Sequence, residues 1–251
     1  MVCRNCNKAA TPQNIFCSYC GEKIIFNRLT VKSFILSFIN DFLSIDNKLI
    51  NTFISLFTNP EKVINGYING FRKIYVNAIP YLGLTLTLIG LQFFILKQFY
   101  PELLNISLVK ETQDGRFSLE TLMKYIYDYQ GLITIISIPL YALISRFVFI
   151  DSKKYNTAEH FVIVSYASAQ LYFVSFFIVI VSLPFGVNYN NLSTYLSIPM
   201  LFYMVYLYKR LYSITVISSF FRGLSYSILS ILAVTIFSAA VTVIYLIISY
   251  F

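Results

Sequence analysis

The chain has 251 residues, of which 57% are hydrophobic and 12% charged, and its mean hydropathy is +0.69. Because soluble domains carry about 25% charged residues, this composition excludes an ordinary soluble globular protein and predicts an integral membrane protein. The net charge of +8 is uneven, since nine of the nineteen Lys and Arg residues precede residue 74 and none follows Arg222. Such an asymmetry predicts how the membrane segments are oriented.

Four cysteines form two Cys-x-x-Cys pairs separated by ten residues, and they are Cys3, Cys6, Cys17 and Cys20. Two such pairs can surround one zinc ion with a closed tetrahedron of thiolates, with bonds of about 2.3 Å. Residues 1–27 are too few to bury a core, so we expect them to form a zinc ribbon folded by one structural Zn²⁺. The alternatives are two accidental pairs or two disulfides in a secreted protein. Thiolate ligands persist in a reducing compartment, which predicts a cytosolic N-terminus.

The N-terminal segment is also basic, and its cations are Arg4, Lys8, Lys23, Arg28 and Lys32. Zinc ribbons can bind nucleic acid, and a phosphate backbone could use these charges. Positive charge just ahead of membrane segments is equally what the positive-inside rule predicts. We therefore favour the membrane interpretation and do not expect nucleic acid as a partner.

Residues 28–75 have a transitional pattern that predicts juxtamembrane helices. Within residues 30–57 the apolar positions have helical spacing, but polar residues interrupt them every few positions. An interfacial or bundle-capping amphipathic helix therefore fits better than a membrane span, and a re-entrant helix is the alternative. A second short helix is predicted to begin after Asn59, with Asn59 as its cap, Pro60 in its first turn and Glu61 at the positive end of its dipole.

Several motifs follow one another in a distinctive order. They are Phe16-Cys17-x-x-Cys20-Gly21, Thr52-Phe53-x-x-Leu56, Asn59-Pro60, Tyr67-Ile68-x-Gly70-x-Arg72-Lys73-x-Tyr75 and Pro80. Over residues 1–96 this order resembles an uncharacterised family of bacterial multi-spanning membrane proteins, known only as a domain of unknown function. The resemblance implies a membrane domain behind a zinc ribbon, and it implies no activity.

A candidate site for lipid headgroups lies just before the first span. Arg72 and Lys73 can bind lipid phosphates, while Tyr67 and Tyr75 place their rings in the headgroup layer, with Gly70 between them. An alternative is a ligand pocket in which the glycines at positions 66 and 70 allow close approach of another helix or of a phosphate.

The remaining sequence predicts an all-α integral membrane bundle, with residues 76–251 as its membrane domain. Five stretches are long and apolar enough to span the membrane, at about residues 76–96, 131–150, 161–185, 192–208 and 224–250. The apolar stretch from Leu211 to Phe221 is too short to span and is predicted to lie along the cytosolic face, and the alternative is that it merges into a longer membrane-embedded element. The loops that alternate to the cytosolic side are the more basic ones, so we expect a multi-pass protein of the cell membrane with its C-terminus outside.

Few residues in the predicted spans are of the types that act in catalysis or bind metals. Arg146, near the end of a span, is expected to reach the cytosolic surface, and His160 to lie at the interface, because one adjacent carboxylate makes neither a metal site nor a triad. We expect no enzymatic activity. The favoured function is a membrane-anchored adaptor or assembly factor whose ribbon docks a cytosolic protein while the bundle contacts membrane lipid. A small-molecule or ion transporter or channel is the alternative, and homo-oligomerisation stays open.

Overall fold

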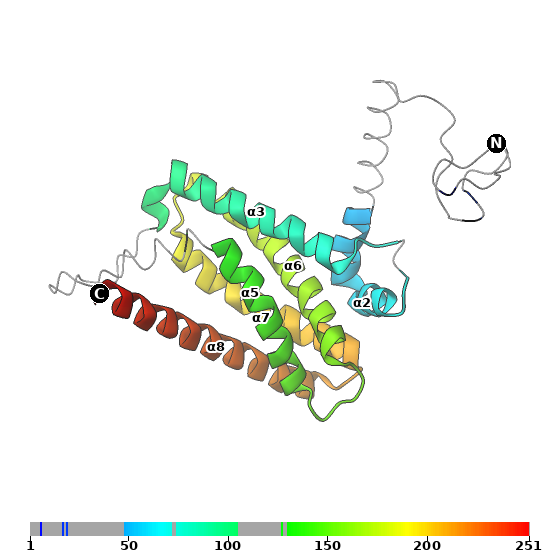
Figure 1. Cartoon of the computed structure of the whole chain (residues 1–251). Helices are drawn as coiled ribbons and strands as arrows, with labels where there is room; N and C mark the ends of the chain where they lie inside the picture. The colour runs from blue at the N-terminus through cyan, green and yellow to red at the C-terminus, as the bar shows by residue number, and fades with distance from the viewer. Residues whose placement is uncertain are drawn as a thin grey trace, which may run out of the picture. The chain divides into compact units, whose positions relative to one another are not determined.

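The computed structural model describes Cys6, Cys17 and Tyr19, residues 48–71, 74–104, 127 and 130–250, with the backbone alone described for residues 237–250. The chain divides into two compact units, Met1–Asn47 and Lys48–Phe251. Every regular element in the described part of the chain is a helix, as the sequence predicts. The second unit is a helical bundle (Figure 1).

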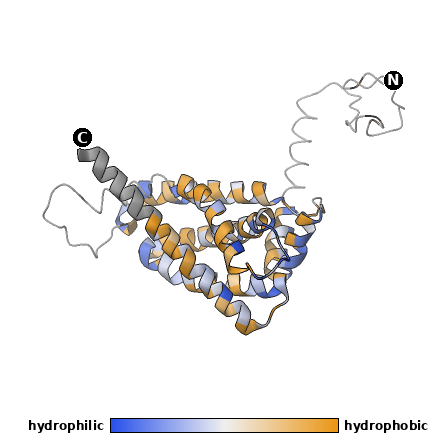
Figure 2. Ribbon diagram, turned by 60° about the horizontal axis from the view of Figure 1, so that its bottom comes forward, coloured by the Kyte–Doolittle hydropathy of each residue, from blue (hydrophilic) through white to orange (hydrophobic). Residues whose placement is uncertain are grey.

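The bundle is made of long apolar helices, and α5 to α8 are joined in order by short turns and a 3-10 segment. Residues 48–58 are helical, and the elements that follow are α2 (Pro60–Ile68), α3 (Ala78–Phe99), η1 (Pro101–Leu104), α5 (Gln130–Val148), α6 (Thr157–Ser182), η2 (Leu183–Phe185), α7 (Tyr189–Tyr212) and α8 (Val216–Tyr250). Figure 2 shows apolar residues repeated along the length of these helices. Many large apolar side chains remain exposed on their outer faces, which suits a lipid environment.

Helix α6 is the centre of the bundle, because it packs against α2, α3, α5 and α7. Residues 163–170 are buried without interruption, as expected for a helix surrounded on all sides. The helix begins at Thr157, earlier than hydropathy alone predicts, because Asn156 and Glu159 form a capping box. The backbone N–H of Glu159 donates to Asn156 Oδ1 at 2.9 Å, and the N–H of Asn156 donates to Glu159 Oε2 at 2.7 Å.

Four helices in the described part of the chain are long and apolar enough to cross a membrane: α3, α5, α6 with η2, and α8. Helix α7, which matches the fourth predicted span, is not among them, because its first turns carry several polar residues. It nevertheless runs the length of the bundle. Tyr189 at its start packs against Phe93 near the end of α3, with ring centroids 5.3 Å apart, and Arg210 near its end bonds Glu61 on α2.

The connection between α7 and α8 differs from the favoured prediction and is closer to the alternative of a longer helix. Instead of a separate interfacial segment from Leu211 to Phe221, α7 continues to Tyr212, a turn at Ser213 adopts φ 54°, and α8 runs unbroken from Val216. Packing explains the difference. The hydroxyl of Ser219 donates to the backbone carbonyl of Val205 at 2.5 Å, and Gly223 crosses Val205 so closely that a Cβ would lie 2.6 Å from its Cγ2.

Residues 48–58 and α2 form a helix pair broken at Asn59 and Pro60. Proline has no backbone N–H, so the carbonyl of Leu56 loses its helical partner, and the hydroxyl of Tyr203 donates to it at 3.2 Å instead. The predicted cap is wrong in one detail. The side chain of Asn59 makes no capping bond to α2 and instead accepts one from Arg210 at 3.2 Å.

The helix at residues 48–58 lies on the side of the bundle, beside the middle of α6, with Thr52 and Leu56 buried. The carbonyl of Phe53 accepts a hydrogen bond from Gln170 Nε2 at 3.1 Å, and Gln170 lies about 20 Å along α6 from Thr157. The charged side chains Glu61 and Glu159 lie much nearer the end of the bundle. This placement favours the re-entrant interpretation of the last part of residues 30–57, whose earlier residues lie outside the described ones.

Candidate functional site

The described part of the predicted ribbon contains one cysteine from each pair. The sulfur atoms of Cys6 and Cys17 lie 3.7 Å apart, and Cys17 is buried. This distance is too long for a disulfide, whose sulfurs are about 2.05 Å apart. It matches the edge of about 3.8 Å of a tetrahedron with zinc–sulfur bonds of about 2.3 Å. Cys3 and Cys20 lie outside the described residues. The described residues contain no cluster of three or more His, Cys, Asp or Glu side chains. Zinc ligation therefore stays a prediction.

Of the predicted headgroup residues before α3, Tyr67 and Tyr75 pack against the bundle. Tyr67 packs edge-on against Tyr166 with ring centroids 5.9 Å apart, and Tyr75 is half-buried against the main core. Arg72 and Lys73 lie outside the described residues, so their contact with lipid stays a prediction. The two tyrosines therefore have packing roles in addition to any contact with the headgroup layer.

Gly70 ends helix α2 rather than opening a pocket. Its φ is +89°, the N–H of Phe71 donates to the carbonyl of Gly66 at 2.8 Å, and the N–H of Gly70 donates to that of Tyr67 at 3.1 Å. This is the Schellman pattern, which favours glycine at the left-handed position. A Cβ on Gly70 would meet no atom within 4 Å, and one on Gly66 only Phe71 at 4.0 Å. The glycine pair therefore does not serve close approach of another part of the described chain.

Charged residues gather at the end of the bundle where α5 and α7 end and α6 and α8 begin. Arg210 on α7 holds Glu61 on α2 through two bonds of 2.6 and 3.0 Å. Arg146 on α5 donates to the carbonyls of Phe149 and Ser152 at 2.9 and 3.2 Å, so it closes the turn that follows its own helix. Together with Lys153, Lys154 and Lys209 these side chains make a basic end, as the loop charges predict.

A second ion pair at the basic end joins the turn after α5 to α8. Arg222 donates to both carboxylate oxygens of Asp151, at 2.6 and 2.8 Å, and its guanidinium lies 4.7 Å from the ring centroid of Phe149. The hydrogen bonds from Arg222 lower the pKa of Asp151 to about 2. This partnership lets a charged residue lie two turns inside α8 without interrupting it.

His160 is fully buried between helices in the first turn of α6, and its predicted place at the membrane interface stays a prediction. Ser145 Oγ lies 2.9 Å from its Nδ1 and 3.1 Å from the hydroxyl of Tyr208, while the hydroxyl of Tyr212 lies 3.1 Å from its Nε2. The ring of Phe149 stacks on Tyr212 with centroids 3.8 Å apart. The Ser145–His160 spacing is that of a nucleophile and its base. Both side chains are 0% exposed, however, so the arrangement serves as a polar contact joining α5, α6 and α7.

Residues 46–90 match the family model described as "Protein of unknown function (DUF3667)". This supports the resemblance to an uncharacterised domain family for a segment that contains residues 48–58, α2 and the first half of α3. The match does not include the predicted ribbon. No curated protein and no solved structure matches the chain.

The matched segment adds apolar side chains to the main core, and several tyrosine hydroxyls, which the sequence did not predict, bond it to the bundle. They join Tyr155 to Asn65 (2.7 Å), Tyr166 to the carbonyl of Val76 (2.8 Å), Tyr203 to that of Leu56 (3.2 Å), Tyr206 to that of Thr58 (3.0 Å), and Tyr81 to Gln170 (2.7 Å). The one available signal was Pro60, which predicts an unpaired carbonyl four residues earlier. Nothing in the sequence says which tyrosine satisfies it.

Proposed function

We propose that the protein is a membrane-anchored adaptor whose cytosolic zinc ribbon docks a partner protein while the helical bundle fixes it in the membrane. The observation that carries this proposal is the 3.7 Å separation of Cys6 Sγ and Cys17 Sγ, one from each Cys-x-x-Cys pair. That separation fits two thiolates on one zinc ion, with Cys3 and Cys20 as the remaining ligands. A closed four-thiolate site folds a segment and presents its surface, which suits docking rather than catalysis.

The bundle has the features of a scaffold. Charged residues in its described helices lie within about two turns of a helix end, whereas transporters commonly carry ionisable groups in the middle of their spans. The buried polar side chains of Ser145, His160 and Gln170 have partners within the bundle: Ser145 bonds to His160, and Gln170 bonds to the backbone carbonyl of Phe53. These contacts fix helices relative to each other and leave no described acid or base facing a path through the bundle.

For the topology we propose five crossings, with α7 as the fourth, a cytosolic basic end and the C-terminus outside. Helix α7 is 24 residues long, about 36 Å, which suffices to span a bilayer. The cations at the basic end support its cytosolic placement. Alkaline phosphatase fused after Phe251 should be active outside the cell and fusion at Lys153 should be silent, and the reverse result contradicts this topology.

A transporter is the second candidate, and one observation favours it. The helix pair broken at Asn59 and Pro60 packs against the middle of α6, and broken helices inside a bundle form the binding sites of many transporters. The adaptor and the transporter differ in their dependence on the ribbon, because a transporter's flux does not need a docked partner.

Crosslinking in intact cells followed by purification tests the adaptor. Full-length protein should retain a defined cytosolic protein that Cys17→Ser loses, while the neighbouring Ser18→Ala retains it as the matched control. The Cys17→Ser variant must still be found in the membrane, so that loss of the partner is not loss of the protein. A partner set unchanged in Cys17→Ser contradicts docking through the ribbon.

A further inference from the structure

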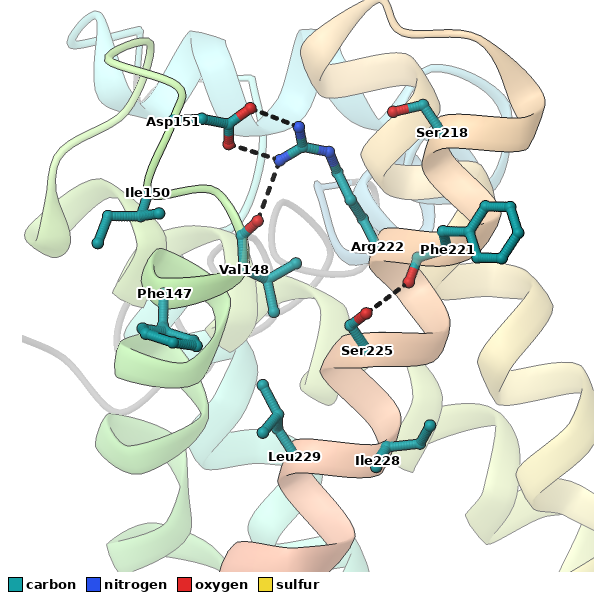
Figure 3. Close-up of a pocket in the computed structure, with 10 residues that line it drawn as sticks. All are labelled: Phe147, Val148, Ile150, Asp151, Ser218, Phe221, Arg222, Ser225, Ile228 and Leu229. Carbon is teal, nitrogen blue, oxygen red and sulfur yellow. Dashed lines mark hydrogen bonds and ion pairs between the residues drawn. The ribbon is translucent and has the colours of Figure 1, made fainter.

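An open groove lies between the end of α5 and the first half of α8, at the basic end of the bundle (Figure 3). Its volume is about 780 Å³, within the range of small-molecule sites. The walls are apolar and are formed by Phe147, Val148, Ile150, Phe221, Ile228 and Leu229. From Arg222 to Leu229 the groove follows α8 for two turns, about 10 Å.

The groove has a charged mouth. Asp151 and Arg222 form their bidentate pair there, and Arg222 Nη1 also donates to the carbonyl of Val148 at 3.0 Å. These bonds use three of the five N–H donors of a guanidinium, so two remain for a ligand. The side chain of Asp151 is 61% exposed, and its carboxylate can accept further hydrogen bonds.

The chemistry of the groove specifies its occupant closely. A ligand needs an apolar chain for the walls, an anion for Arg222 and a cation with N–H donors for Asp151, with the two charges a few ångströms apart. A phospholipid with a primary ammonium headgroup has all three, and the groove opens on the outer face of helices whose exposed residues suit lipid. A choline headgroup has no N–H to donate, and a glycerol headgroup carries no cation.

We propose that this groove binds phosphatidylethanolamine, with its phosphate at Arg222, its ammonium at Asp151 and one acyl chain along the walls towards Leu229. The two charges of the headgroup then pair with the two charges of the mouth, which a purely anionic lipid cannot do without placing its phosphate beside Asp151. The site is separate from the predicted headgroup residues before α3 and does not depend on the ribbon.

Native mass spectrometry of the full-length protein, purified in mild detergent and titrated with single lipids, tests the proposal. The wild type should bind one phosphatidylethanolamine at least about tenfold more tightly than phosphatidylcholine with the same chains, the effect of one charge-assisted hydrogen bond. Asp151→Asn keeps the size of the side chain and should remove that preference while improving the binding of phosphatidylglycerol, because Arg222 loses its internal anion.

A variant that blocks the groove distinguishes lipid binding in the groove from general contact with lipid. Leu229→Trp should fill the space and weaken phosphatidylethanolamine binding about tenfold, whereas Ile231→Trp, at a 64% exposed position outside the lining, should leave it unchanged. Circular dichroism of each variant checks that it is folded. Equal affinity of the wild type for the ethanolamine and choline lipids, or unchanged binding in Leu229→Trp, overturns the proposal. A dimer that Leu229→Trp abolishes would identify a second copy as the occupant and would overturn it too.

Discussion

Replacing Gly223 by alanine tests how α7 and α8 are packed. The new Cβ would lie 2.6 Å from Val205 Cγ2, against about 3.5–4.0 Å for carbons in contact. Either the helices separate by about 1 Å or Val205 leaves a rotamer that is stiff in a helix. Overpacking of this kind costs about 1–3 kcal/mol, and the higher helix propensity of alanine offsets about 1 kcal/mol of it.

Gly90→Ala is the matched control, because Gly90 is also helical but a Cβ there would meet no atom within 4 Å. Unfolding in mixed detergent micelles, followed by circular dichroism, should show Gly223→Ala less stable than Gly90→Ala by about 1–3 kcal/mol, the full overpacking cost. Adding Val205→Ala should restore part of the loss, since it removes the atom in conflict. Equal stability of the two glycine variants would refute the close crossing of α7 and α8.

Two further substitutions test the tyrosine contact and the exposed ion pair. Tyr203→Phe leaves a buried carbonyl without a donor and should lower the free energy of unfolding by about 1–3 kcal/mol in the same assay, whereas Tyr195→Phe, at a 70% exposed position, should not. Because the folded pKa of Asp151 is about 2, below its usual value of about 3.9, the stability it contributes is present above about pH 4 and lost as the pH falls towards 2. The stability difference between wild type and Asp151→Asn should therefore be constant from pH 5 to 8, shrink below about pH 4 and vanish only below pH 2. A difference at pH 2 as large as that at pH 5 contradicts the pairing with Arg222.

The sequence was sufficient for features set by local chemistry. Apolar runs predicted the long helices of the described part of the chain, and the break before Pro60 followed from the missing N–H of proline. The sequence Asn156-x-x-Glu159 is also a capping-box pattern, and it predicts the observed start of α6 at Thr157. The end of α2 at Gly70 has the same local origin, although the sequence analysis assigned Gly70 only to a headgroup site or to a close approach.

Contacts between distant helices could not be predicted in this way. The burial of His160 depends on Ser145 and Tyr212, which belong to two other helices, and hydropathy carries no information about such partners. Arg222 is a second case. A charge inside an apolar run predicts the boundary of a span, whereas the pairing of Arg222 with Asp151 allows α8 to continue through it. Resolving either case requires the arrangement of the helices in space.

The zinc content of freshly purified, reduced, full-length protein tests the central claim of the proposed function most directly. Elemental analysis should find about one zinc per chain in the wild type and in Ser18→Ala, and a background amount in Cys6→Ser with Cys17→Ser, because loss of two thiolates leaves no closed tetrahedron. Less than half an equivalent of zinc in the wild type, or full zinc content in the double variant, would contradict a structural zinc ribbon at these cysteines.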